Sequence, residues 1–169
     1  ESARSGALRV TLTRGPQARG IGQAVTVRPT VLATLSDFDE ALQGRPLELQ
    51  ISDVRRNQTS PLSRHKTLAY TEPLYANRKA RQSGFDDTLF TNLDAQITCT
   101  SIGNIFAVFG HRLITPPVED GVLPGIIRGW IIDHAPKLGY EIEVGSIDVL
   151  TLQKADCVFM TNSLRLMCP

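Results

Sequence analysis

Four short strand patterns follow one another in the middle of the chain, and they constrain the fold more than any other stretch. They lie at residues 88–91, 97–99, 105–109 and 112–115. Asp94-Ala95 supplies a turn between the first two, and Gly110-His111 supplies one between the last two. The spacing therefore predicts two successive β-hairpins.

Other strand and helix patterns surround these hairpins. Further strands are predicted at residues 8–12, 25–34, 47–51, 142–144 and 157–161, and helices at 37–43, 73–82, 126–139 and 149–154. Pro73 suits a first helical turn with Thr71 as its cap, and Gly84 and Gly139 suit helix ends. We therefore predict one sizeable core of mixed α and β structure, with room for part of a second domain.

The composition is that of an ordinary globular protein, with 41% hydrophobic and 21% charged residues. No apolar run approaches the roughly 20 residues that a membrane helix requires, so no membrane span is expected. The cysteines, Cys99, Cys157 and Cys168, are odd in number and lack the spacing of metal ligands. We therefore expect no metal site and a reduced, cytoplasmic protein.

Charge is unevenly divided along the chain. Residues 1–81 carry 13 Lys and Arg against 7 Asp and Glu, a net charge of +6. Residues 82–169 carry 5 against 10, a net charge of −5. A basic half attracts anionic partners. Its arginines are scattered without interleaved aromatic residues, which disfavours nucleic acid as the partner.

Lys66 is the residue with the strongest claim to chemistry. Four lysines stand against fourteen arginines, and the other three lysines fall on predicted polar helix faces. Lys66 instead lies between a polar loop and the start of an apolar helical pattern. A lysine amine becomes a nucleophile or a Schiff-base partner when its surroundings favour the neutral form. The competing interpretation is a solvated lysine at a helix start.

Several further stretches offer polar groups to an anion. The free N–H groups of a helix that begins at Gly125-Ile126-Ile127 suit a phosphate. Thr161-Asn162-Ser163 ends a buried strand, and residues 98–104 form a small, polar connection between the two hairpins. Arg14 and Arg19 lie in a glycine-punctuated loop and present guanidinium groups to a carboxylate or phosphate. Taken singly, each stretch is explained as well by capping, turn hydrogen bonds or a solvated linker.

Together these motifs resemble the class IV aminotransferases, the pyridoxal-phosphate enzymes of fold type IV. The resemblance runs from about Leu8 to Pro169. It rests on the order of Lys-Thr-Leu, Gly-Phe-Asp-Asp, Gly-Asn-Ile-Phe, Thr-Pro-Pro, Leu-Pro-Gly-Ile-x-Arg and Ala-Asp-x-Val-Phe-x-Thr-Asn. The two-arginine loop and the short lysine motif look most like the 4-amino-4-deoxychorismate lyase branch. Branched-chain aminotransferases and D-amino acid transaminases belong to the same family.

The resemblance implies an α+β fold with a curved mixed sheet and flanking helices. It divides the chain into residues 1–14, the remnant of a small N-terminal domain, residues 15–27, an interdomain linker, and residues 28–169, the large cofactor-binding domain. Most of the small domain is absent, so we expect a fragment, with weak or no catalysis if this is its true length. The family likeness also implies a homodimer.

The implied site holds pyridoxal 5′-phosphate and takes a small anionic amino substrate. Lys66 would carry the Schiff base and shuttle protons, and Tyr70 would lie near the cofactor ring. The residues that would bind the phosphate are Ile126 and Ile127 through their backbone, with Ser163 and Asn162. Arg14 or Arg19 would meet a carboxylate of the substrate.

Cys99 departs from the family pattern. Most members carry a glutamate at this position, which pairs with the pyridine nitrogen of the cofactor and keeps it protonated. A thiol is a weak donor and acceptor, so Cys99 cannot hold that proton as a carboxylate does. A lyase that expels pyruvate, or a weakened enzyme, is easier to reconcile with this residue than a transaminase.

Three functions therefore remain open. The first is a lyase that converts 4-amino-4-deoxychorismate to 4-aminobenzoate and pyruvate on the folate route. The second is an aminotransferase of branched-chain or D-amino acids. The third is a non-catalytic remnant that keeps the fold for oligomer or partner contacts, which Cys99 and the missing domain favour.

Overall fold

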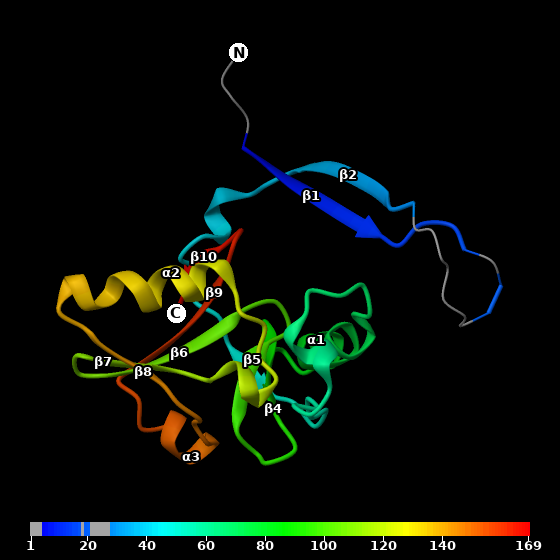
Figure 1. Cartoon of the computed structure of the whole chain (residues 1–169). Coiled ribbons are helices and arrows are strands. Elements are labelled where there is room, and N and C mark those ends of the chain that lie inside the picture. The colour runs from blue at the N-terminus through cyan, green and yellow to red at the C-terminus, as the bar shows by residue number, and fades with distance from the viewer. Residues whose placement is uncertain (1–4, 18, 21–27) are drawn as a thin grey trace. The chain divides into compact units, whose positions relative to one another are not determined.

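A computed structural model of the chain describes residues 5–17, 19–20 and 28–169 (Figure 1). The chain divides into two compact units, Glu1–Glu40 and Ala41–Pro169. This division falls later than the predicted start of the large domain at residue 28, because the strand that follows the loop pairs back onto the first strand. The three-part division by domain stays a prediction, and residues 18 and 21–27 of the predicted linker lie outside the described residues.

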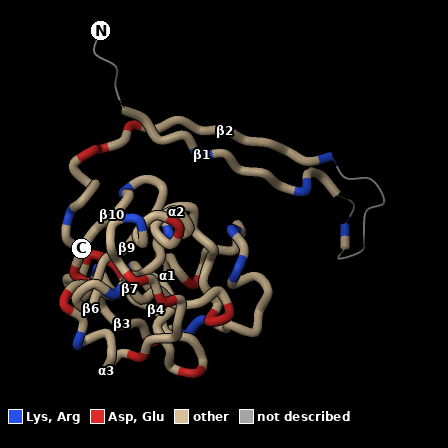
Figure 2. Tube along the Cα trace, turned by 60° about the vertical axis from the view of Figure 1, so that its left-hand side comes forward, with Lys and Arg blue, Asp and Glu red and all other residues tan. Residues whose placement is uncertain are grey.

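The first unit is a two-stranded antiparallel ribbon. β1 (Gly6–Thr13) pairs with β2 (Thr30–Asp37). Successive side chains of a strand alternate between its faces, so the register gathers apolar side chains on one face of the ribbon. They are Leu8, Val10 and Leu12 from β1 and Val31, Ala33 and Leu35 from β2, all exposed. Figure 2 shows few charged positions along these two strands.

A mixed sheet forms the second unit. Its strands are β3 (Leu49–Ile51), β4 (Asp87–Thr91), β5 (Ile97–Thr100), β6 (Asn104–Phe109), β7 (Arg112–Thr115), β8 (Glu141–Val144), β9 (Cys157–Asn162) and β10 (Leu166–Cys168). The order is β10-β9-β6-β5-β4-β3, and β7 branches from β6 to pair with β8. β3–β4 and β7–β8 are parallel, and the other neighbouring pairs are antiparallel. Both predicted hairpins are confirmed.

The sheet curves until its two ends meet. The N–H of Leu47, just before β3, donates to the carbonyl of Pro169 at 2.8 Å. The N–H of Gly44 donates to the carbonyl of Met167 in β10 at 3.1 Å. The expectation of a curved mixed sheet is therefore confirmed, and the edge strands β3 and β10 are bound to each other through the chain that leads into β3.

Three α-helices flank the sheet, α1 (Thr71–Gln82), α2 (Ile126–His134) and α3 (Val149–Leu152) (Figure 1). Short 3-10 turns occupy Glu40–Leu42, Pro61–Arg64, Val118–Asp120 and Ala135–Leu138. The helix predicted to reach Gly139 is α2 continued by a 3-10 turn, and Gly139 ends it with a φ of 86°. The cap prediction at Thr71 is wrong, because Tyr70 holds the cap position and Thr71 is the first helical residue.

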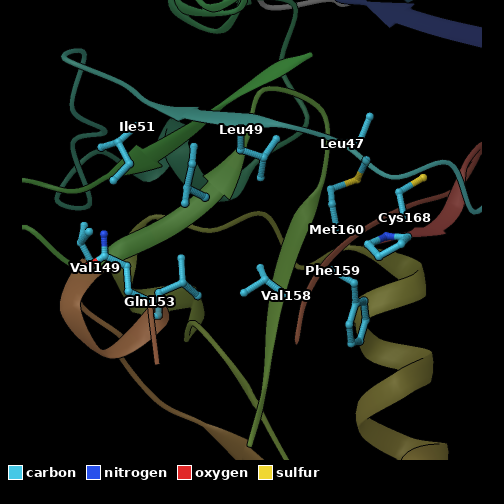
Figure 3. A pocket seen from close by; sticks show the side chains of 12 residues that line it. Leu47, Leu49, Ile51, Val149, Gln153, Val158, Phe159, Met160 and Cys168 are labelled. Atoms are coloured by element: carbon cyan, nitrogen blue, oxygen red, sulfur yellow. The ribbon is translucent and has the colours of Figure 1, made fainter. Parts of the chain in front are cut away.

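An apolar cavity of about 320 Å³ lies inside the curve of the sheet (Figure 3). Leu49, Leu89, Val158 and Met160 line it from the strands, and Gln153 is the polar side chain at its wall. Side chains of neighbouring residues in β4 point to opposite faces, so Leu89 faces this interior while Phe90 packs with Ala76 of α1. The cavity offers almost no polar group for chemistry, and the polar residues gather on the side of the sheet that faces α1 and α2.

Candidate functional site

Lys66 lies in the irregular segment between the 3-10 turn at Pro61–Arg64 and α1. The prediction that it opens a helix is wrong, because the helix begins five residues later. Its side chain is exposed, and its Nζ lies 5.9 Å from the centre of the Tyr70 ring. An ammonium at this distance over an aromatic face is attracted by the ring. Lys66 is therefore directed toward Tyr70.

Tyr70 connects the lysine segment to the sheet. It occupies the cap position of α1, and its carbonyl accepts the N–H of Leu74 at 3.1 Å. Its hydroxyl donates to the carbonyl of Ser101, in the connection between β5 and β6. Burial raises the pKa of Tyr70. The nearby Cys99 and Asp87 side chains add to this rise, and the charge of Arg56 opposes it. Tyr70 is therefore a protonated phenol, a hydrogen-bond donor, at neutral pH.

Arg56 joins the lysine segment to the loop that precedes α2. Its Nη2 donates to the carbonyl of Ser63 at 3.1 Å, and its Nε donates to the carbonyl of Gly121 at 3.2 Å. Its backbone N–H donates to Thr91 at the end of β4 at 2.8 Å. The sequence showed Arg56 only as one of several charges in a polar loop, so nothing in the local pattern distinguished it.

The N-terminus of α2 has the features of an anion-binding turn. Gly125 holds the cap position with no side-chain cap, which leaves the first N–H groups of the helix without a partner among the described residues. A Cβ at Gly125 would collide with Oδ1 of Asn104, the first residue of β6. The Nδ2 of Asn104 donates to the carbonyl of Leu123 at 2.8 Å. The helix terminus is thus held directly against the β5–β6 connection.

Arg128 anchors the same helix turn from inside. Its side chain is buried, with Nε 3.3 Å from Oγ1 of Thr115 and Nη2 donating to the carbonyl of Pro116 at 2.9 Å. Burial lowers the pKa of Arg128, and the charge of Glu119 opposes that change. The arginine of the Leu-Pro-Gly-Ile-x-Arg motif is therefore a tether for the helix terminus.

Thr161 adds an unused hydroxyl near this turn. Its Oγ1 is buried and has no hydrogen-bond partner, which is uncommon for a buried polar group. Phe159, two residues earlier in β9, packs with Ile131 of α2, so alternation places Thr161 on the same α2-facing side. The sequence marked this stretch for its hydroxyls, and Thr161 is the member that the structure leaves unpaired.

Asn162 and Ser163 follow at the end of β9 and in the turn beyond it. The Oδ1 of Asn162 accepts the N–H groups of Leu164 and Arg165, at 2.9 and 2.7 Å. Its Nδ2 donates to Ile102 at 3.3 Å, so the amide is already occupied within the turn and the β5–β6 connection. Ser163 is exposed. Of the two, Ser163 keeps its polar group available for a ligand.

Cys99 is a buried thiol in β5, packed with Ala76 and Phe90. Burial raises the pKa of Cys99; Arg56 and the Thr98 hydroxyl oppose the rise, and Asp87 adds to it. The thiol is therefore neutral and protonated at neutral pH. It presents no charge that would hold a proton on a neighbouring ligand nitrogen.

These residues converge on one element, the β5–β6 connection. Tyr70, which faces Lys66, bonds to it at Ser101, and the α2 terminus contacts Asn104, the residue of β6 that directly follows it. Arg14 and Arg19 are exposed and belong to the first unit, which is described by itself, so their role at this site stays a prediction. Within the described residues there is no His, Cys, Asp and Glu cluster that could hold a metal. None of the described helices is long and apolar enough to cross a membrane.

A model of the family described as Amino-transferase class IV matches residues 1–169. The chain belongs to the class IV aminotransferase family. Among curated relatives, the aminodeoxychorismate lyase of Bacillus subtilis is 27% identical over 157 residues, 93% of this chain and 54% of the relative. Branched-chain-amino-acid aminotransferase 1 of Arabidopsis thaliana is 38% identical over 96 residues, 56% of this chain and 25% of the relative. The chain thus spans about half the length of that lyase.

Solved structures of class IV proteins share the fold of this chain. A Legionella pneumophila protein, provisionally assigned as a 4-amino-4-deoxychorismate lyase, superposes with a TM-score of 0.87 and 31% identity over 96% of this chain and 60% of its own. The branched-chain aminotransferase of Thermoproteus uzoniensis, solved with norvaline, has a TM-score of 0.89 and 25% identity over 97% and 56%. The fold is that of fold type IV aminotransferases, as expected.

The class IV residues present here fit a phosphate better than they fit a pyridine ring. The uncapped α2 terminus and the unpaired Thr161 hydroxyl supply donors of the kind that bind phosphate. The close approach of Gly125 to Asn104 holds that terminus in place. Cys99, which is predicted to take the place of the glutamate that pairs with the pyridine nitrogen, is a neutral thiol.

Proposed function

We propose that this chain is the cofactor-binding part of a pyridoxal-phosphate lyase that converts 4-amino-4-deoxychorismate to 4-aminobenzoate and pyruvate, on the folate route. The observation that carries the proposal is the convergence of the Lys66–Tyr70 pair and the α2 terminus on the β5–β6 connection. The lyase is favoured within the family because aminodeoxychorismate lyases of Bacillus subtilis and Vibrio harveyi align along 93% and 95% of this chain.

Pyridoxal 5′-phosphate, when bound, supplies an electron sink for bonds next to the substrate amine. Lys66 would hold the cofactor covalently through its amine and would move protons, because it is the lysine directed at the Tyr70 ring. Tyr70 donates a hydrogen bond from a phenol that stays protonated at neutral pH. The hydrogen bond from its hydroxyl to the carbonyl of Ser101 limits the motion of Tyr70.

The phosphate of this cofactor would be held at the start of α2. The free N–H groups of Ile126 and Ile127 would donate to it, and Thr161 of β9 and Ser163 in the turn that follows would contribute hydroxyls. Asn162 supports this group indirectly, since its amide shapes the turn that carries Ser163. Arg128 keeps the helix terminus in place through Thr115 and Pro116.

The whole protein acts on a small anionic amino substrate and works as a homodimer in this proposal. Arg14 and Arg19 bind a substrate carboxylate, which suits their exposed guanidinium groups and the basic first half of the chain. Cys99 favours a lyase over a transaminase, because a neutral thiol does not keep the pyridine nitrogen protonated.

An aminotransferase of branched-chain or D-amino acids is the second candidate function. It is favoured by the 38% identity to the Arabidopsis branched-chain enzyme over 96 residues. A non-catalytic member of the family is the third, favoured by the thiol at Cys99. The lyase releases pyruvate from its substrate without an amino acceptor, whereas the aminotransferase requires one.

The test begins with the cofactor. The chain is mixed with pyridoxal phosphate, reduced with borohydride, and digested for mass spectrometry. We expect a visible absorbance band and a reduced adduct on Lys66, both lost in Lys66→Ala. Lys79→Ala is the matched control, since Lys79 is exposed on α1 and pairs with Asp53. An adduct on other lysines alone, or no cofactor uptake, would overturn the proposal.

The second step separates the three functions. Pyruvate is measured after addition of 4-amino-4-deoxychorismate without any amino acceptor. Release that Lys66→Ala abolishes supports the lyase. Turnover only in the presence of an amino acceptor identifies the aminotransferase, and cofactor binding without turnover of either kind identifies the non-catalytic member.

A further inference from the structure

Asp87 is a buried carboxylate outside the residues assigned so far. It is the first residue of β4 and only 2% exposed. Its Oδ1 accepts the backbone N–H of Thr88 and the side-chain N–H of Asn77, both at 2.7 Å. Its Oδ2 is buried without a hydrogen-bond partner. Burying a carboxylate with one oxygen unpaired costs stability, so the residue calls for an explanation beyond packing.

The hydrogen bonds of Asp87 lead to Tyr70. The amide of Asn77 that bonds Asp87 also lies 3.4 Å from Oγ of Ser101. The carbonyl of Ser101 accepts the hydroxyl of Tyr70. Tyr70 at the cap of α1 and Asn77 within α1 are seven residues apart, about two turns, so they lie on the same side of the helix. The start of β4, one face of α1 and the β5–β6 connection are therefore joined in one polar chain.

Several charged or polar side chains surround Tyr70. Lys66 lies over its ring, and Arg56, Cys99 and Asp87 act on it electrostatically. A cavity of about 180 Å³ borders Tyr70, Asn77, Asp87 and Ser101, and the other charged residues on its wall are Arg81, Asp86 and Arg165. Asp87 is the carboxylate among these that reaches Ser101 through Asn77.

We propose that Asp87 is a positioning residue for Tyr70: through Asn77 and Ser101 it fixes the Tyr70 hydroxyl beside Lys66, and its negative charge disfavours the phenolate. The role of Tyr70 rests on the proposed function, but the contact network does not. Asp87 acts through other residues and needs no contact with cofactor or substrate. Its unpaired oxygen leaves the charge poorly neutralised, which strengthens its effect on the phenol.

The test is a pH titration of the Tyr70 phenol in the chain without cofactor. Tyrosinate absorbance is recorded for wild type and for Tyr70→Phe, and the difference isolates Tyr70 from Tyr75 and Tyr140. In Asp87→Asn the negative charge is gone and the phenolate is less disfavoured, so we expect the pKa of Tyr70 to fall by about 0.5 to 1. Circular dichroism checks that the variant is folded across the titration.

Asp86→Asn is the matched control. Asp86 lies on the same cavity, but its carboxylate bonds Arg45 and the N–H of Glu48 instead of Asn77. We expect the pKa of Tyr70 to stay at its wild-type value in this variant. An equal change in Asp86→Asn and Asp87→Asn would overturn the proposal, since any nearby charge would then serve.

If Asp87→Asn does not fold, the titration of Tyr70 is carried out on Asn77→Ala instead. Asn77 is half-buried on α1, so its truncation is better tolerated, and it cuts the link from Asp87 to Ser101. Asn77→Ala keeps the charge of Asp87 but loosens Ser101, whose carbonyl accepts the Tyr70 hydroxyl. Because that hydrogen bond favours the protonated phenol, the pKa of Tyr70 should fall, by less than in Asp87→Asn. An unchanged pKa in a folded variant of either kind refutes the proposal. Cofactor uptake, measured separately on the same proteins, reports on the proposed function and leaves this titration independent of it.

Discussion

Gly125 shows how a single missing side chain positions the site. Its φ of −69° and ψ of 146° are open to any residue, so glycine is not required there by backbone conformation. It is required by space, because a Cβ would meet Oδ1 of Asn104. The contact between helix terminus and sheet therefore depends on one absent methyl group. Gly129, one turn later in α2, has no atom within 4 Å of an added Cβ and serves as its natural comparison.

We predict opposite effects for the two glycines. Gly125→Ala forces the terminus away from Asn104, so it should destabilise the protein by about 1–3 kcal/mol and weaken binding of pyridoxal phosphate roughly tenfold. Gly129→Ala should stabilise it by about 0.5–1 kcal/mol, because glycine inside a helix costs backbone entropy. Urea unfolding and cofactor titration measure both quantities. Equal behaviour of the two variants would mean that the Asn104 contact does not position the terminus.

At the scale of elements, the sequence predicted what is local and missed what is distant. The hairpins β4–β5 and β6–β7 were visible because each turn lies within the pattern that it joins. The turn before β10 was not, since it depends on the Asn162 side chain and on a φ of 58° at Leu166. The parallel pairs β3–β4 and β7–β8 join segments separated by a helix, and no local pattern reports them.

The residues of the candidate site also fall into two groups, those indicated by local motifs and those whose partners are distant along the chain. Lys66 and Tyr70 are four residues apart, and the N-terminus of α2 is marked by Leu-Pro-Gly, so sequence alone indicated both as candidates. Arg56 and Asp87 were missed, because their partners lie far along the chain. The unpaired Thr161 hydroxyl could be recognised only once its surroundings were known. Motifs thus identified the ends of the site, and tertiary contacts revealed what holds them together.

Arg128, which tethers α2 to the sheet, is expected to stabilise the folded protein. Arg128→Met removes hydrogen bonds to Thr115 and Pro116 and leaves those buried acceptors with fewer partners. We expect a loss of about 2–4 kcal/mol in the free energy of unfolding. Arg112→Met is the control, because its ion pair with Glu143 is half-exposed and worth about 0–1 kcal/mol. Urea denaturation compares the two, and a loss for Arg128→Met no larger than the control's would show that the tether carries no stability.

At the scale of the whole molecule, the two units differ in how they hide apolar surface. The second unit buries its apolar residues inside the curved sheet and under its helices. None of the described residues of the first unit is buried, although one face of its ribbon is apolar from Leu8 to Leu12 and from Val31 to Leu35. A two-stranded ribbon of this kind is marginally stable by itself in water. Exposed contiguous apolar faces mark interaction sites or promote association.

The exposed apolar face of the ribbon therefore predicts self-association of the chain. Leu8 and Leu35 are directly opposed on the apolar face and are 66% and 76% exposed. We expect the chain to self-associate as its concentration rises, and Leu8→Lys/Leu35→Glu to raise the dissociation constant at least about tenfold, since charges on this face resist burial. Ala7→Lys/Ser36→Glu places the same charges on an opposed pair of the other face and should associate as wild type does. Sedimentation velocity over a concentration series measures both. If both variants raise the dissociation constant equally, the added charges weaken self-association wherever they lie on the ribbon, and the apolar face is not the contact surface.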